Sequence, residues 1–196
     1  MDNVLAIIGE YNPFHNGHLY HLKESKEKTH TDYTIAIMSG NFVQRGNAAI
    51  LDKWTRAKIA ILNGVDLVIE LPCIYSISSA ENFAMGAIKI LNSLKIVDSV
   101  SFGTEIDDIT ILEEFADILT DEPAEYKSLL SHELSKGISY PKARENALLM
   151  YLNDIRKYAN ILSSPNNILA IEYLKAMNLT NSEIFPVSIK RIGPRL

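Results

Sequence analysis

Few features of the sequence fit a secreted or membrane protein. Cys73 is the only cysteine among 196 residues, so the chain forms no internal disulfide and offers no cluster of thiolate metal ligands. No apolar run approaches the ~20 residues that a membrane-spanning helix needs. Asp2 stands where a signal peptide would carry basic residues, and no small-residue cleavage site follows it. We therefore expect a cytoplasmic protein with no membrane partner.

An excess of positive charge is also missing. The 24 acidic residues outnumber the 19 Lys and Arg residues, which gives a net charge of −5. This balance argues against a protein that wraps nucleic acid with its whole surface, although it leaves room for a local patch. Lys53, Trp54 and Arg56 could form such a basic and aromatic patch for RNA. Alternatively, and equally well, Trp54 could pack in the core.

The first hundred residues alternate between apolar runs and helical segments. Continuous apolar strands separated by helices predict a parallel sheet that is covered on both faces and has right-handed crossovers. The predicted strands cover residues 4–9, 33–39, 65–72 and 97–105, and the predicted helices cover 18–28, 51–64 and 79–94.

The second half of the chain is mostly helical. Helices are predicted over 108–119, 122–136, 140–152 and 165–177, followed by a fifth strand at 184–189. The 47% hydrophobic content and the length suit one large domain. We expect the fold class α/β, with a parallel five-stranded sheet and an α-helical insertion or cap at about 107–179 within one domain over 1–196.

The segment GEYNPFHNGHLYHL, residues 9–22, follows the first predicted strand. Ligands of doubly wound sheets bind at the carboxyl ends of the strands, and the N-terminus of the following helix attracts an anion. Gly17 allows close approach to the backbone, and His15 and His18 bring two imidazoles to the same place. A phosphate-bearing ligand explains all of these features. Two alternatives are a zinc site, for which no third ligand has suitable spacing, and plain helix capping.

Several blocks of sequence resemble a known family. YNPFHNGH resembles the signature of the HxGH nucleotidyltransferases, which have a Rossmann-like sheet. MSGNFVQRG, DKWTRAKIAILNGVDLVIELP, SFGTE, SPNNILAIEYLKA and IKRIG resemble the bacterial tRNA(Met) cytidine acetate ligase family over nearly the whole chain. After IKRIG the sequence departs from the family pattern, because PRL replaces a glycine-rich continuation. We therefore expect the C-terminal region of the family to be absent.

The resemblance implies a reaction and its partners. ATP and acetate would give acetyl-adenylate and pyrophosphate, with Mg²⁺ on the leaving pyrophosphate. The acetyl group would then pass to the wobble cytidine of elongator tRNA(Met) and form N4-acetylcytidine. Two alternatives stay open, namely a small-molecule adenylyltransferase acting on pantetheine phosphate or nicotinamide mononucleotide, and a nucleotide-binding module without catalysis.

The resemblance also assigns site residues, whereas no metal ligands can be identified. From the residues alone, Gly103 reads equally well as a turn glycine. One of Asn166 and Asn167 could cap the helix while the other reaches the nucleotide, and a solvated surface pair is an alternative for Lys190 with Arg191. Of the two asparagines we favour Asn166 for the nucleotide. The residues assigned to catalysis are His15, His18 and Lys190. Those assigned to ATP are Ile7, Ile8, Gly9, Glu10, Tyr11, Asn12, Pro13, Phe14, His15, Asn16, Gly17, His18, Leu19, Tyr20, Gly103, Asn166, Asn167 and Arg191.

A polar loop follows the second predicted strand. It is rich enough in glycine and polar side chains to recognise acetate or to contact tRNA, and its candidate residues are Ser39, Asn41, Gln44 and Arg45.

The remaining histidines and the cysteine have ordinary interpretations. His21, His30 and His132 are read as helix-surface residues, and Cys73 as a small buried hydrophobe.

Overall fold

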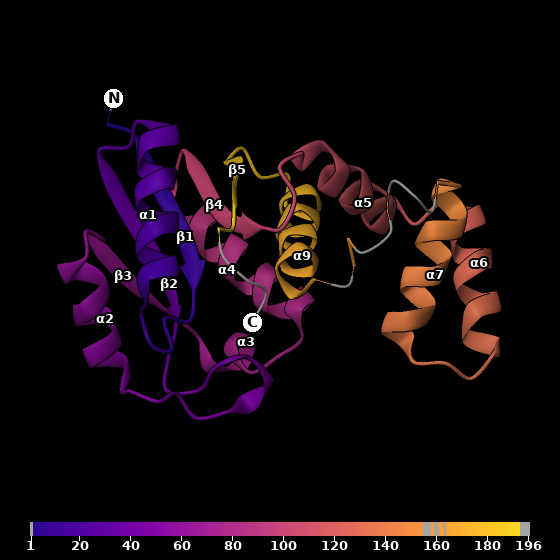
Figure 1. Ribbon diagram of the computed structural model, residues 1–196, viewed down its shortest axis with the longest axis horizontal. Coiled ribbons are helices and arrows are strands. Elements are labelled where there is room, and N and C mark those ends of the chain that lie inside the picture. Colours follow the sequence, from indigo (N-terminus) through magenta and orange to yellow (C-terminus); the bar gives the residue numbers. More distant parts are fainter. Residues whose placement is uncertain (1, 155–157, 159–160, 163, 193–196) are drawn as a thin grey trace.

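A computed structural model describes residues 2–154, 158, 161–162 and 164–192. Within these residues the strands form one parallel sheet in the order β3-β2-β1-β4-β5 (Figure 1). The α/β class and the parallel five-stranded sheet predicted from the sequence are confirmed. The strands are β1 Val4–Gly9, β2 Tyr33–Ser39, β3 Leu67–Leu71, β4 Ser99–Thr104 and β5 Phe185–Lys190.

The order of the strands creates a switch point beside β1. The chain builds β2 and β3 on one side of β1 and then returns to place β4 on the other side. In such sheets the crevice outside the carboxyl ends of the strands next to the switch is the usual place for a ligand. The helices are α1 Asn16–Thr29, α2 Lys53–Leu62, α3 Cys73–Ser76, α4 Ala80–Leu94, α5 Ile109–Asp121, α6 Ala124–Ser135, α7 Tyr140–Leu152 and α9 Pro165–Leu179, with a 3₁₀ turn at Gln44–Gly46.

Helices cover both faces of the sheet, as alternate residues of β1 show. Ile7 packs in a cluster with Leu22 of α1 and Ala60 of α2. Ile8 belongs to a larger cluster that includes Phe83 of α4 and residues of α5 and α9. No helix within the described residues is long and apolar enough to cross a bilayer.

The helices between β4 and β5 have two kinds of partner. α5 and α9 pack against each other, and α9 also packs against α4 and β4. α6 and α7 pack against each other and stand apart from the sheet (Figure 1). An ion pair of 2.7 Å between Arg144 of α7 and buried Glu172 of α9 joins this pair of helices to the main body.

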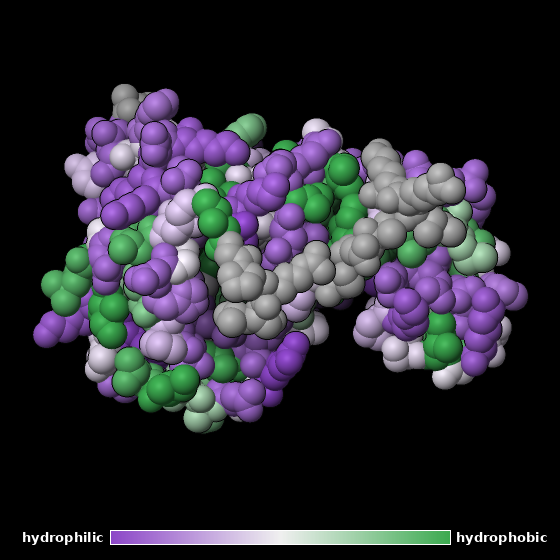
Figure 2. All heavy atoms as spheres, viewed as in Figure 1, coloured by the Kyte–Doolittle hydropathy of each residue, from purple (hydrophilic) through white to green (hydrophobic). Residues whose placement is uncertain are grey.

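The structure decides the positions of three side chains that the sequence left open or placed differently. Trp54 is 76% exposed, so its reading as core packing is wrong. Cys73, predicted to be buried, is exposed. Arg56 is fully buried and therefore cannot belong to an RNA-facing patch. Figure 2 shows apolar side chains at the surface over α2, where Leu62 is also exposed.

Candidate functional site

A pocket of about 330 Å³ lies at the carboxyl ends of β1, β4 and β5. This volume is within the range of small-molecule sites. From the residues predicted for ATP or catalysis it gathers Ile7, Ile8, Gly9, Tyr11, His15, Gly17, His18, Tyr20, Gly103, Asn166, Lys190 and Arg191. Residues that the sequence did not assign to the site complete the wall, namely His21, Phe102, Leu169, Tyr173, Ile189 and Ile192.

The two motif histidines form a stacked pair at the start of α1. Their ring centroids are 3.7 Å apart and the rings are inclined by 20°. His15 is the N-cap, and its Nδ1 accepts a hydrogen bond from the backbone N–H of Gly17 at 3.0 Å. The Nδ1 of His18 accepts one from the backbone N–H of His15 at 3.2 Å. The helix-capping alternative is therefore correct as a local description, and it leaves the outer ring nitrogens available.

These contacts define which ring nitrogens can donate. A neutral imidazole whose Nδ1 accepts a hydrogen bond carries its proton on Nε2. Burial, with His15, His21 and Arg191 nearby, lowers the pKa of His18 from 6.5 to about 4. His18 is therefore a neutral donor at pH 7, and both rings can present Nε2–H groups to a ligand.

Position 17 needs a residue without a side chain, because the ring of His15 lies close to it. A Cβ at position 17 would lie 2.9 Å from Cε1 and 3.1 Å from Nδ1 of the His15 ring. The group that approaches this glycine is therefore the capping imidazole. Because that ring already occupies the Gly17 N–H, the helix N-terminus is less open to an anion than the sequence predicts.

Two cations border the other side of the pocket, at the end of β5. Lys190 forms an ion pair of 2.6 Å with Asp107. Arg191 contacts Oε1 of Glu105 at 3.0 Å, and the same oxygen accepts a hydrogen bond of 2.8 Å from Asn166. The pocket thus has imidazole N–H donors on one side and paired cations on the other, which is an arrangement suited to phosphate groups.

Comparison with known proteins decides the family. Residues 2–195 match the family model described as HIGH Nucleotidyl Transferase. The chain belongs to this nucleotidyltransferase family. The resemblance predicted from the sequence motifs is therefore confirmed.

The nucleotidyltransferase chain is also similar to named enzymes. It is 57% identical over 190 residues to the tRNA(Met) cytidine acetate ligase of Thermoanaerobacter sp. strain X514, covering 97% of this chain and 47% of that protein. It is 56% identical over 195 residues to the enzyme of that name from Clostridium botulinum strain Kyoto, covering 97% and 48%. The crystal structure of Thermotoga maritima TmcAL bound with alpha-thio ATP matches with a TM-score of 0.94 at 45% identity, covering 97% of this chain and 47% of that one. The chain spans about half the length of the curated relatives it matches.

The two asparagines of the nucleotidyltransferase have separate positions. Asn166 lines the pocket. Asn167 is buried, accepts a hydrogen bond from the backbone N–H of Glu105 at 2.9 Å and donates one to the carbonyl oxygen of Ile161. The N-cap of α9 is Ser164, so neither asparagine caps this helix.

His21 is a pocket residue and not the surface residue that the sequence predicts. Its Nε2 lies 2.9 Å from Oγ of Ser101 on β4, and that hydroxyl lies 2.6 Å from Oγ of Ser25. Burial lowers the pKa of His21 to about 4, opposed by a hydrogen bond to the backbone of Phe102. His21 therefore attaches α1 to β4 within the same pocket as the motif histidines.

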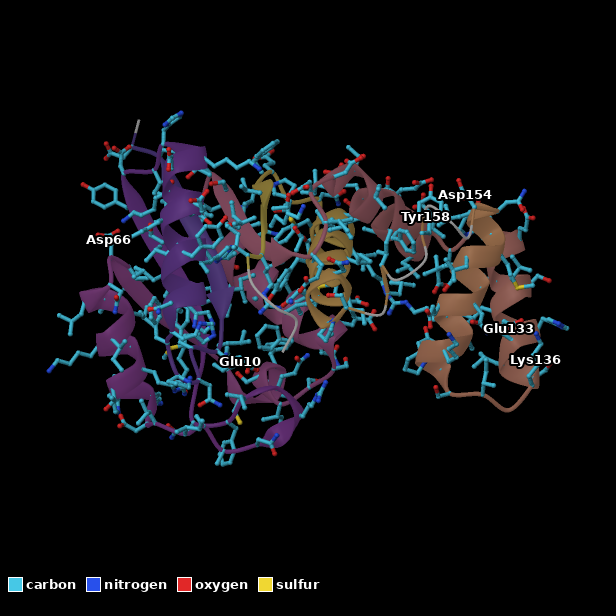
Figure 3. The ribbon with its side chains drawn as sticks, viewed as in Figure 1. Glu10, Asp66, Glu133, Lys136, Asp154 and Tyr158 are labelled. Atoms are coloured by element: carbon cyan, nitrogen blue, oxygen red, sulfur yellow. The ribbon has the colours of Figure 1, made fainter. Side chains whose placement is uncertain are left out.

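Other motif residues hold the polar loop and do not line the pocket. The carboxylate of Glu10, labelled in Figure 3, accepts a hydrogen bond from the backbone N–H of Gln44 at 2.7 Å. Oδ1 of Asn12 accepts one from the backbone N–H of Ile50 at 2.7 Å. The residues assigned to ATP that lie outside the pocket wall are Glu10, Asn12, Pro13, Phe14, Asn16, Leu19 and Asn167.

The polar loop is attached to Glu10, which stands in the chain between the pocket residues Gly9 and Tyr11. Ser39 is fully buried at the end of β2, whereas Asn41 and Arg45 are exposed and Gln44 is half-buried. None of these four loop residues lines the pocket. Among the residues that the structure describes, no three His, Cys, Asp or Glu side chains are placed to hold a metal ion.

Proposed function

We propose that this chain binds ATP and activates acetate for the acetylation of the wobble cytidine of elongator tRNA(Met). One observation carries the proposal: the motif histidines and Arg191 meet in a single pocket. The chain around that pocket is 57% identical to a named tRNA(Met) cytidine acetate ligase. Because the chain spans about half of that relative, the activity of the longer protein is a proposal for this one.

ATP would lie across the pocket with its phosphates between the histidines and the cations. The Thermotoga maritima protein was crystallised bound with alpha-thio ATP, an analogue of ATP, which supports ATP as the nucleotide here. His15 and His18 would donate from Nε2, and Lys190 and Arg191 would supply positive charge. Gly103 lines the pocket on β4 with the stem of Arg191 over it, and we place the adenosine on this side of the pocket.

The first step joins two anions, so the site must neutralise charge. A carboxylate oxygen of acetate attacks the α-phosphorus, a new P–O bond forms, and the bond to the β-phosphate oxygen breaks to release pyrophosphate. Acetate is already ionised at neutral pH and needs no general base. Fixed N–H donors and cations around the phosphates are the expected source of rate enhancement.

The second step transfers the acetyl group. The exocyclic amine of the cytidine attacks the acetyl carbonyl carbon, the bond to the phosphate oxygen breaks, AMP leaves, and the nitrogen releases a proton to solvent. Asn41 and Arg45 are the exposed residues of the polar loop, which Glu10 holds through Gln44, and they are our candidates for the tRNA or acetate contact.

Mg²⁺ would enter with the nucleotide as MgATP. Mg²⁺ in nucleotide sites is held by substrate phosphates with one or two carboxylates, so the site needs no cage of protein ligands. Because the proposed substrate is a cytoplasmic tRNA, we propose that the chain acts in the cytoplasm.

Acetate-dependent release of pyrophosphate from MgATP, with and without elongator tRNA(Met), tests the proposal. We expect release that requires acetate, and acetyl transfer when the tRNA is present. His18→Ala should lower the rate by about 10²-fold or more, because it removes a donor to the phosphates. His132→Ala, on the exposed face of α6, is the matched control and should leave the rate unchanged.

Each result has a distinct meaning. Release without transfer would restrict the function of this chain to acetate activation. ATP binding without release would indicate a nucleotide-binding module. Release that depends on pantetheine phosphate or nicotinamide mononucleotide in place of acetate would contradict the proposed substrate.

A further inference from the structure

Glu105 connects two of the pocket residues that we propose as ATP contacts. Its carboxylate oxygen Oε1 accepts one hydrogen bond from Nδ2 of Asn166 at 2.8 Å and one from Nη1 of Arg191 at 3.0 Å. Asn166 lies in the first turn of α9, and Arg191 follows β5 directly. A single oxygen atom therefore joins residues that are far apart in the chain.

Glu105 is itself held in place. Its backbone N–H donates to Oδ1 of Asn167, a side chain that is only 1% exposed and also donates to the carbonyl oxygen of Ile161. The preceding Thr104 hydroxyl donates to the carbonyl oxygen of Ile106 at 2.7 Å and fixes the turn after β4. The side chain of Glu105 is only 17% exposed, so the surrounding protein restricts its position.

Arg191 is much freer than its partner. Its side chain is 41% exposed. Its stem passes over Gly103, where a Cβ would lie 3.7 Å from Cγ and 3.9 Å from Cδ of the arginine. Glu105 follows β4 directly and stands two residues beyond Gly103. Arg191 therefore extends across Gly103 and ends at Glu105.

We propose that Glu105 is a positioning residue that holds Asn166 and Arg191 in the orientation that receives ATP. This rests on the proposed function, because it takes ATP as the ligand of the pocket. A guanidinium has five N–H donors, so the contact with Glu105 leaves donors for a phosphate. A partly exposed ion pair contributes little attraction, and the benefit comes from ordering both side chains before the nucleotide binds.

Calorimetric titration of the chain with ATP tests this role. Glu105→Ala should weaken ATP binding by about five- to thirtyfold, because two side chains must then be ordered during binding. Glu105→Gln keeps an oxygen that can accept both hydrogen bonds, so it should lose less than about threefold. Unchanged or tighter binding by Glu105→Ala would overturn the proposal, as would equal losses in the two variants.

The matched control is Glu81→Ala. Glu81 also joins α9 to a neighbouring element through an ion pair, with Lys175 at 2.7 Å, but it lies outside the pocket wall. It should leave ATP binding unchanged. In an Arg191→Ala background, Glu105→Ala should cost less than in the unsubstituted chain, because one of its two targets is gone. Fully additive losses would contradict an action through Arg191.

A measurement without ATP separates this inference from the proposed function. In the ligand-free chain, Glu105→Ala should move the NMR signals of the Asn166 side-chain amide toward those of a solvent-exposed amide, and Glu105→Gln should not. If the unsubstituted chain binds no ATP, the proposed function fails, while these signals still decide whether Glu105 orders Asn166. Amide signals unchanged in Glu105→Ala would overturn the positioning role whatever the ligand.

Discussion

The charge state of His18 follows from the residues around it. Its ring is packed edge-on against Tyr11, with centroids 5.1 Å apart, and its Nδ1 accepts the backbone N–H of His15. Burial is the largest cause that lowers its pKa to about 4. We predict an NMR titration midpoint for His18 near that value without ATP, and a higher midpoint with ATP, because phosphate charge favours the protonated ring. A midpoint above about 6 without ATP would contradict a neutral donor.

Arg191→Ala is the control for this titration. The positive charge of Arg191 is one of the causes that lower the pKa of His18, so its removal should raise the midpoint. The rise should be smaller than the rise caused by ATP, because burial remains the main cause. The NMR signal of His18 is assigned as the one that disappears in the His18→Gln variant.

Site residues could be predicted where they are adjacent in the chain. His15, Gly17 and His18 stand together, so their spacing alone indicated a phosphate site. His21 and Glu105 were missed because their roles depend on partners 80 and 86 residues away. Periodicity and composition carry no information about such pairs, and a buried histidine on a helix has the same sequence signal as an exposed one.

Among the helices, α2 shows how one buried side chain holds a loop against the motif. Arg56 donates to the carbonyl oxygen of Leu51 at 3.1 Å, to that of Glu10 at 2.5 Å, and to that of Gly40. We predict that Arg56→Ala lowers the free energy of unfolding by about 3 kcal/mol or more, because it leaves one buried and two partly buried carbonyl groups without this donor. Urea unfolding measures this. Lys58→Ala, on the exposed face of α2, should change it by less than about 0.5 kcal/mol, and similar values for both would contradict the anchoring role.

Element boundaries were predictable where the apolar pattern ends abruptly. The predicted strands 4–9 and 33–39 agree with β1 and β2. The helix predicted over 51–64 covers Lys53–Leu62, and its start is set by Asp52, which caps it by accepting the backbone N–H of Thr55. Helix α3 and the 3₁₀ turn were missed, since segments of three or four residues are too short to show a helical period.

For the whole molecule, His18 and His21 link the stability of the fold to pH. The pKa of each is about 4 in the folded chain and about 6.5 when unfolded. Between these values the unfolded chain binds more protons, so stability is full above about pH 6.5 and falls as the pH drops toward 4. Glu81 and Glu133 have lowered pKa values, so their contribution is lost only as the pH falls below about 4.5. The two histidines and the two glutamates therefore affect stability in separate pH ranges.

Urea unfolding at several pH values tests this linkage. Two histidines that each take up one proton on unfolding predict a slope of up to about 2.7 kcal/mol per pH unit between pH 4.5 and 6. His18→Gln should reduce the slope by about half, because His21 remains between α1 and β4. A free energy of unfolding that stays constant between pH 6.5 and 5 would show that neither ring is held neutral. A slope unchanged in His18→Gln would assign the linkage to His21, and thus to the contact of α1 with Ser101 on β4.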